Sequence, residues 1–256
     1  MSQKINRFYT DLWIDDFGLN DVKEYDRKWY ERFEKNVKHR QQVGFVGKYL
    51  RREDYWCDCP IGSGRLMRHL SADLMLGFDK SPMFVEFNRK RGIEVLEGDI
   101  RDFPFENKFD VISCLNMLFA FEAPEPIIEK LVQGLKPGGM LVLDLSCADH
   151  VDRCRKIEYD FTTGKSFKNA EILELFNSLG CDVIEIEKHD FWDNRYFHQF
   201  WRKNGYLNKG VYAFLNSIYF RMKLYPVFSF LGKLFANHLH AKYLVSVRKR
   251  DNGTNR

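Results

Sequence analysis

The chain has 256 residues, of which 45% are hydrophobic and 16% aromatic, enough to bury the core of one large domain or two small ones. This composition excludes intrinsic disorder as the main state. The 40 Lys and Arg residues outnumber the 36 Asp and Glu residues by four, an excess too small to indicate a dedicated nucleic-acid-binding protein.

The charge is unevenly distributed along the chain. Residues 191–256 contain 12 Lys/Arg and 2 Asp/Glu, which gives +10, whereas residues 1–190 contain 28 and 34, which gives −6. The basic segment also holds 16 of the aromatic residues. It therefore differs in chemistry from the rest of the chain.

The amino terminus and the cysteines bear on the compartment. The first ten residues lack the apolar stretch of a signal peptide, so we expect a cytoplasmic protein with reduced, structural cysteines. Cys57-x-Cys59 has no second cysteine pair at zinc spacing. The longest apolar runs, 211–220 and 224–232, are too short for a membrane-spanning helix of about 20 residues.

The chain opens with an arm and a helix. Residues 1–20 are expected to be a loose arm, and residues 21–50 a helix on which Tyr25, Trp29 and Phe33 recur every four residues. Strands and helices then alternate. The predicted strands are 55–57, 74–78, 93–96, 109–114, 140–143, 182–187 and 243–247, and the predicted helices between them include 65–70, 81–91, 126–135 and 167–179.

Strands separated by short helices favour parallel pairing with helices on both sheet faces. The sequence therefore predicts a doubly wound, mostly parallel, seven-stranded α/β sheet with an N-terminal helix and a helical, basic insertion before the last strand. We expect residues 1–50 to form an arm and capping helix, 51–190 the core, 191–242 a helical lid or acceptor-binding insertion, and 243–256 the final strand and tail.

In an open parallel sheet, ligands bind beyond the carboxyl ends of the strands. After the first predicted strand comes Asp58-Cys59-Pro60-Ile61-Gly62-Ser63-Gly64, a turn of small residues that a ligand can approach closely. Asp79, after the second strand, stands 21 positions beyond Asp58, the separation at which an acid can accept both hydroxyls of a ribose. These positions predict a nucleoside site.

The next two strand ends extend the predicted site. Gly98-Asp99-Ile100 offers a carboxylate beside an apolar wall, which suits the amine and the face of adenine. Cys114-Leu115-Asn116 would cover the other face of the base. A dinucleotide site is less well matched, because it requires three glycines and Pro60 occupies the place of the first.

At these residues the chain resembles the class I S-adenosylmethionine-dependent methyltransferases, with their Rossmann-like domain. The resemblance covers roughly residues 48–147 and includes Leu135-Lys136-Pro137-Gly138-Gly139 before the fifth strand. Pro60 departs from the commonest form of the glycine motif, because it lacks an N–H and cannot take a positive φ. The resemblance implies S-adenosylmethionine as cofactor, bound by Asp58, Pro60, Gly62, Gly64, Asp79, Lys80, Asp99, Ile100 and Cys114.

Transfer of a methyl group to a hydroxyl benefits from a general base near the acceptor. His150, which follows the fifth strand, is the first candidate, and His189 and His198 are the next. No metal-binding pattern is present, because His238-x-His240 has no carboxylates nearby in the sequence.

The basic, aromatic insertion has three interpretations. It is a helical cap on the core, a pocket for an apolar or lipid acceptor, or an element that lies on an anionic membrane at the inner face. The protein is then expected to methylate a hydroxyl of a small-molecule, lipid-linked or glycan acceptor, with nucleic acid less favoured; the oligomeric state is left open. The alternative is a noncatalytic scaffold or cofactor sensor that docks a partner through this segment.

Overall fold

The computed structural model describes residues 37–149, 164–189 and 242–251, and these form one sheet flanked by helices. The sheet has seven strands in the order β3-β2-β1-β4-β5-β7-β6. Their bounds are β1 Tyr55–Asp58, β2 Leu74–Asp79, β3 Val95–Glu97, β4 Phe109–Cys114, β5 Leu135–Ser146, β6 Cys181–His189 and β7 Lys242–Lys249. The first five strands are parallel, and β7 runs antiparallel to both β5 and β6.

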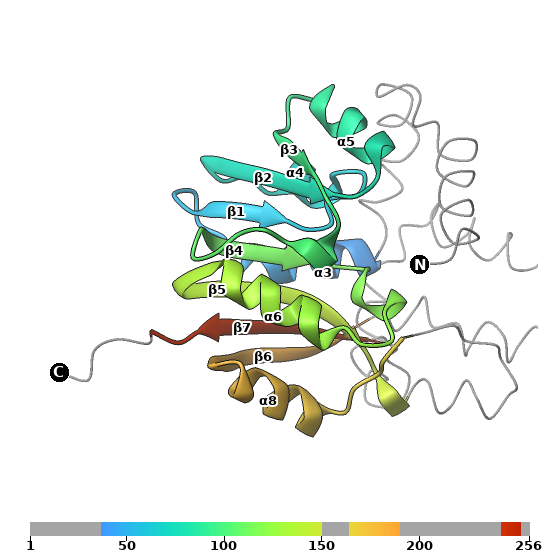
Figure 1. Cartoon of the computed structure of the whole chain (residues 1–256), viewed down its shortest axis with the longest axis vertical. Helices are drawn as coiled ribbons and strands as arrows, with labels where there is room; N and C mark the ends of the chain where they lie inside the picture. Colours follow the sequence, from blue (N-terminus) through green and yellow to red (C-terminus); the bar gives the residue numbers. More distant parts are fainter. Residues whose placement is uncertain (1–36, 150–163, 190–241, 252–256) are drawn as a thin grey trace, which may run out of the picture.

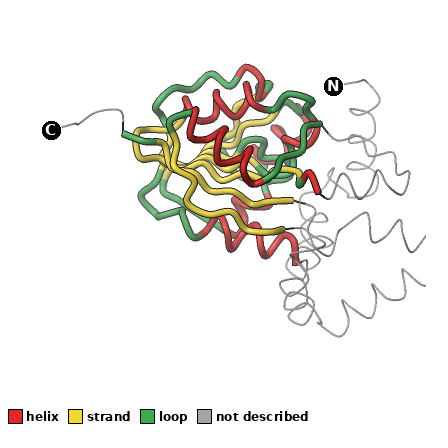
Figure 2. Tube along the Cα trace, turned by 90° about the horizontal axis from the view of Figure 1, so that it is seen from below, coloured by secondary structure: helices red, strands yellow, loops and turns green. Residues whose placement is uncertain are grey.

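Helices cover both faces of the sheet (Figures 1 and 2). Their bounds are α3 Val37–Gly47, α4 Arg65–His69, α5 Pro82–Arg89, α6 Glu125–Gly134 and α8 Asn169–Ser178, with short 3-10 turns η2 Ile100–Asp102 and η3 Leu118–Ala120. Buried side chains of α6 and α8 pack on one face, and those of α3, α4 and α5 pack on the other. This arrangement confirms the predicted doubly wound α/β fold.

Successive side chains of the central strands contribute alternately to two hydrophobic clusters, one on each face of the sheet. On β1, Trp56 packs with α3 and α4, whereas Cys57 packs with α6 and α8. On β4, Val111 and Ile112 divide in the same way. Successive side chains of a strand point to opposite faces, so an apolar run in a parallel strand is buried on both sides. The apolar run Met140 to Leu143 of β5 fits this rule, since all four side chains are buried.

Several helix and strand boundaries differ from those predicted from the sequence. The predicted helix through Leu50 ends at Gly47, and the predicted loop over residues 136–139 belongs to β5. β5 begins early because Leu135 already pairs with Phe109, and the register then shifts before Val111. The part of the N-terminal helix and arm before Val37, and nearly all of the insertion, lie outside the described residues.

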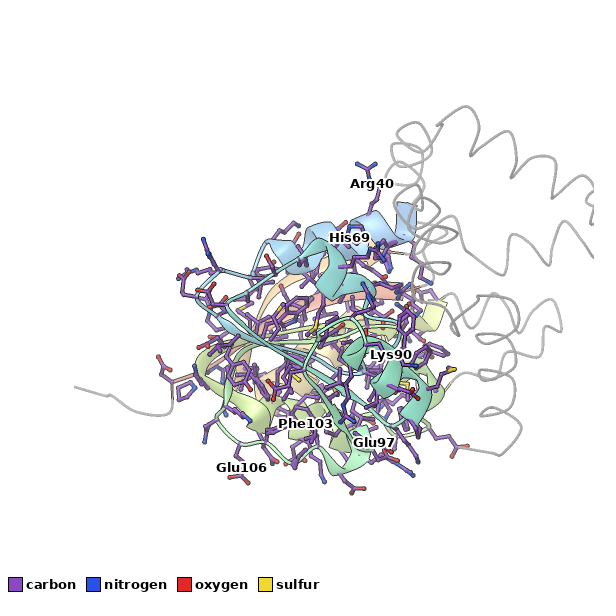
Figure 3. All side chains as sticks on the ribbon, turned by 90° about the horizontal axis from the view of Figure 1, so that it is seen from above. Arg40, His69, Lys90, Glu97, Phe103 and Glu106 are labelled. Atoms are coloured by element: carbon purple, nitrogen blue, oxygen red, sulfur yellow. The ribbon has the colours of Figure 1, made fainter. Side chains whose placement is uncertain are left out.

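Helix α3 packs against α4 through two histidine rings. The centroids of His39 and His69 are 5.0 Å apart. Figure 3 shows His69 beside α3 and Arg40 pointing away from the core. Burial, with the positive charge of Arg65 nearby, lowers the pKa of His39 to about 3, so His39 is neutral and serves as part of the packing.

The cysteines of the described residues are buried and form no disulfide: Cys57, Cys59, Cys114, Cys147 and Cys181. Among the helices that the structure describes, none has the length and apolar character needed to cross a bilayer.

Candidate cofactor and active site

The turn after β1 is tied to both neighbouring strands. Cys59 N–H donates to the carbonyl of Ser113 on β4 at 2.8 Å, and Ile61 N–H donates to the carbonyl of Phe78 on β2 at 3.0 Å. Gly62 and Gly64 have φ of 52° and 71°, a region that side chains rarely adopt. A Cβ on Gly62 would meet nothing within 4 Å, so its backbone borders open space. The turn is thus rigid and open to a ligand.

Asp79 connects this turn to the end of β2. Its Oδ2 accepts the N–H of Gly62 at 2.8 Å, and its Oδ1 accepts the N–H of Ser81 at 2.9 Å. Burial raises the pKa of Asp79, while these backbone donors act in the opposite direction. The two sequence motifs around Gly62 and Asp79 therefore meet in space as predicted.

Asp58 ends β1 and is buried beneath the turn. Trp56 Nε1–H donates to Ser113 Oγ at 2.9 Å, and the Ser113 hydroxyl donates to Asp58 Oδ1 at 2.6 Å. Burial raises the pKa of Asp58 to about 7 despite this hydrogen bond. With a pKa of about 7, Asp58 can gain or lose a proton near neutral pH.

Asp99 follows β3 and accepts four hydrogen bonds from two cations. The backbone N–H, Nε and Nη2 of Arg101 donate at 3.0, 3.0 and 2.6 Å, and Lys80 Nζ donates at 2.8 Å. Arg101, followed by Lys80, lowers the pKa of Asp99, so the carboxylate stays ionised. A carboxylate has about four acceptor positions, and these four donors occupy them. A ligand amine must therefore share an oxygen of Asp99 with one of these donors or displace it.

The apolar residues predicted for the adenine site lie deep. Ile100 is buried beside Asp99, and Cys114 is fully buried in the core that faces α6 and α8. Burial raises the pKa of the Cys114 thiol well above its ordinary value. Pro60 follows a cis peptide bond and is half-buried in the turn.

A polar cluster at the ends of β4 and β5 was not identified from the sequence. Asp144 Oδ1 accepts the N–H of Asn116 at 2.8 Å, and its Oδ2 accepts from Lys242 Nζ at 2.8 Å. The Asn116 amide also exchanges hydrogen bonds of 3.3 and 3.4 Å with Gln42 of α3. Asp144 directly follows the apolar run 140–143, but its pairing with Lys242 cannot be inferred from the sequence, because the two residues are far apart in it.

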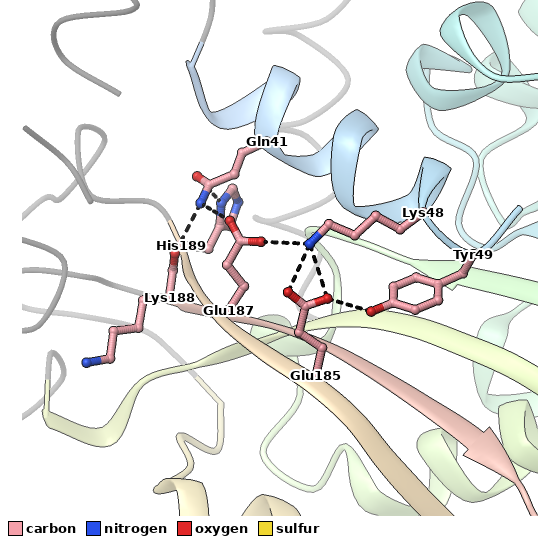
Figure 4. Close-up of polar contacts among 7 residues, drawn as sticks. All are labelled: Gln41, Lys48, Tyr49, Glu185, Glu187, Lys188 and His189. Atoms are coloured by element: carbon pink, nitrogen blue, oxygen red, sulfur yellow. Dashed lines mark hydrogen bonds and ion pairs between the residues drawn. The ribbon is translucent and has the colours of Figure 1, made fainter. Parts of the chain in front are cut away.

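Figure 4 shows a second network, which fastens α3 to β6. Lys48 Nζ lies 2.9 Å from Glu185 Oε1 and 3.5 Å from Glu187 Oε2, and Tyr49 Oη donates to Glu185 at 2.6 Å. Gln41 donates to Glu187 and contacts Nδ1 of His189 at 3.0 Å.

Of the three histidines proposed as bases, only His189 is described. It is 1% exposed at the end of β6 and pairs across the sheet with Lys242. Its contact with Gln41 places it in the network that holds α3. His150 and His198 lie outside the described residues. No group of three or more His, Cys, Asp or Glu side chains that suits a metal ion occurs in the described part of the chain.

These features define a doubly wound α/β domain whose acidic groups gather at the carboxyl ends of its parallel strands. The family description "Methyltransferase domain" matches residues 57–143. A carboxy-S-adenosyl-L-methionine synthase of Erwinia tasmaniensis is 30% identical over 172 residues, covering 57% of this chain and 69% of that protein. One of Klebsiella pneumoniae is 33% identical over 157 residues, covering 52% and 63%. The chain thus spans about two thirds of the length of these relatives.

Solved structures share the fold. One chain from the complex between the Haloferax volcanii Trm112 methyltransferase activator and a candidate methyltransferase has a TM-score of 0.58 at 16% identity, covering 92% of this chain and all of its own. The [4+2]-cyclase SpnF has a TM-score of 0.54 at 19% identity, covering 82% and 80%. The present chain belongs to the class I S-adenosylmethionine-dependent methyltransferases, a family of enzymes, and S-adenosylmethionine is its cofactor.

The raised pKa of Asp58 predicts a pH-dependent stability. A carboxyl whose pKa is higher in the folded chain contributes stability that is full below about pH 4, the unfolded value, and is lost as the pH rises through about 7. Asp58→Asn removes this titration. The variant should therefore gain stability over the wild type between about pH 5 and about pH 7, by at most about 1.4 kcal/mol per pH unit. Urea denaturation across this range measures the difference, and parallel curves would contradict the assignment.

Proposed function

We propose that the chain transfers the methyl group of S-adenosylmethionine to a hydroxyl of a small-molecule, lipid-linked or glycan acceptor. The proposal rests on one observation. The carboxyl ends of the parallel strands form one edge of the sheet, the carboxyl edge, and this edge has two chemically different parts. Acids and a glycine turn lie at the ends of β1, β2 and β3, and a separate polar cluster lies at the ends of β4 and β5. The first part suits a nucleoside, and we propose that the second faces the acceptor.

The residues present fit the cofactor. Asp79 lies at the turn with an ionisable carboxylate that can accept ribose hydroxyls, and Asp99 is an ionised acceptor for the amine of adenine. Gly62 leaves room for a close approach of the backbone. When bound, S-adenosylmethionine supplies a methyl group already activated on a sulfonium. The protein must then align the acceptor and exclude water.

A hydroxyl acceptor must lose its proton during transfer. We retain His150 as the proposed base, because it follows β5 in the sequence. His189 is a weaker proposal, since its Nδ1 is already engaged by Gln41. We further propose a cytoplasmic location, with the basic segment 191–242 contacting the acceptor or an anionic membrane surface.

Asp79→Ala tests the cofactor site. The substitution removes a charge-assisted contact to the ribose worth about 1.5–3 kcal/mol, so affinity for S-adenosylmethionine should fall about tenfold to a hundredfold. Calorimetric titration measures the affinity. Asp73→Ala is the matched control, because Asp73 is an exposed acid just before the same strand, paired with Arg52. Equal affinity of the Asp79 variant and the wild type would reject the site.

The similarity to carboxy-S-adenosyl-L-methionine synthases supports a second candidate function. Under it, the chain would modify the cofactor itself rather than an acceptor. The 30% identity extends over 172 residues, so the relatives share more than the matched methyltransferase domain of residues 57–143.

Mass spectrometry of the nucleoside extracted from the purified protein separates the two functions. Methyl transfer predicts S-adenosylmethionine or S-adenosylhomocysteine as the bound species. The synthase reaction predicts a sulfonium heavier than S-adenosylmethionine by the added carboxyl group. Recovery of the carboxylated species alone would count against methyl transfer as the main reaction.

A further inference from the structure

The ion pair between Asp144 and Lys242 is buried at the acceptor side of the carboxyl edge. The side chains of Lys242 and Asp144 are 13% and 1% exposed, and their charged atoms are 2.8 Å apart. Lys242 Nζ also lies 4.6 Å from the centroid of the Phe119 ring. Burying two charges costs several kcal/mol each, so such a pair contributes little net stability. We therefore expect the pair to matter for the residues that it positions.

The pair fixes an unusual turn. Asn116 has a φ of 60°, a left-handed conformation that only a few per cent of residues other than glycine adopt. Asp144 holds its backbone N–H, Gln42 contacts its side-chain amide, and Lys242 Nζ lies 3.4 Å from its Oδ1. Three elements, α3, β5 and β7, therefore determine the conformation of one residue at the end of β4.

The position of this turn in the sheet gives it a functional context. β4 lies next to β1 on the side away from β2 and β3, and β5 follows. Adjacent strands are about 4.8 Å apart, so Asn116 stands one strand beyond the glycine turn. In the proposed binding mode the nucleoside lies over the ends of β1 to β3, and the reacting end would extend across the crevice between the loops after β1 and β4.

A second lysine of β7 contacts a left-handed asparagine at the opposite end of the sheet. Lys249, at the other end of β7, donates to Oδ1 of Asn107 at 2.9 Å and to the carbonyl of Leu135 at 2.7 Å. Asn107 also has a positive φ, 46°. The same strand thus carries two lysines that contact left-handed asparagines, one at each edge. Lys249 is therefore a matched control.

We propose that Lys242 is a positioning residue for the reaction. Acting through Asp144, it holds Asn116 in the conformation that contacts the reacting end of bound S-adenosylmethionine. This inference rests on the proposed function. It predicts that loss of the pair disturbs the methyl end of the cofactor and leaves the nucleoside end in place.

The test compares ligands that differ in the reacting end. Adenosine and S-adenosylmethionine are titrated calorimetrically, and the methyl resonance of bound [methyl-13C]S-adenosylmethionine is recorded. The variants are Lys242→Met, Lys242→Arg, the double variant Lys242→Met with Asp144→Asn, and Lys249→Met. The double variant is needed because Lys242→Met alone leaves a buried carboxylate unpaired, which destabilises the fold.

The double variant should bind adenosine within about twofold of the wild type and S-adenosylmethionine about threefold to tenfold more weakly, with a shifted or broadened methyl resonance. Lys242→Arg should restore the resonance, since a guanidinium still pairs with Asp144. Lys249→Met should leave both ligands and the resonance unchanged.

Two results would overturn the positioning role. One is a double variant with the wild-type methyl resonance and wild-type affinity for S-adenosylmethionine, which would make the pair structural only. The other is an equal loss of affinity for adenosine and S-adenosylmethionine, which would indicate general damage to the site. Failure of the wild type itself to bind S-adenosylmethionine would instead reject the proposed function.

Discussion

Three carboxylates are almost fully buried at the carboxyl ends of parallel strands, and each must have partners because an unpaired buried charge is costly. Asp58 is held by the hydroxyl of Ser113, Asp79 by two backbone amides, and Asp144 by Asn116 and Lys242. In each case at least one donor comes from a different strand or turn. The need to satisfy these groups therefore fixes the loops at this edge.

The strand order explains why the edge can also receive a ligand. β1 lies between β2 and β4, and the chain crosses from β1 to β2 and β3 on one side before it returns to β4 on the other. The loops after β1 and β4 consequently leave in opposite directions, which opens a crevice in doubly wound sheets. Glycine at positions 62 and 64 keeps the backbone of the first loop compatible with this geometry. At Gly64 the reason is steric, since a Cβ would lie 2.2 Å from Oδ1 of Asn88.

Much of this architecture was predictable from local pattern. The alternation of apolar strands with short helices, and an acid directly after a strand, are features of neighbouring residues, so Asp58, Asp79 and Asp99 could be placed at one edge before the fold was known. Asp144 and Lys242 could not be paired in this way. Their contact depends on β7 inserting antiparallel beside β5, and no local pattern records which strand a late segment will join. The same holds for Gln41 and Gln42, which reach β6 and β4 from a helix at the start of the described chain.

The polar contacts of α3 connect the two ends of the site. Gln42 reaches Asn116 at the end of β4, and the neighbouring Gln41 reaches His189 at the end of β6. His189 and Lys242 are partners in the sheet. A single helix thus contacts both the turn after β4 and the end of β6, where His189 pairs with Lys242 of β7.

The central claim is that the carboxyl edge, and not the opposite edge, receives S-adenosylmethionine. Amide 1H–15N spectra recorded during titration with the cofactor test this most directly. We expect shifts at Gly62, Ser81, Arg101 and Asn116, with Gly138 and Gly139 at the opposite edge unchanged. Shifts confined to Gly138, Gly139 and their neighbours, or no shifts at saturating cofactor, would contradict it.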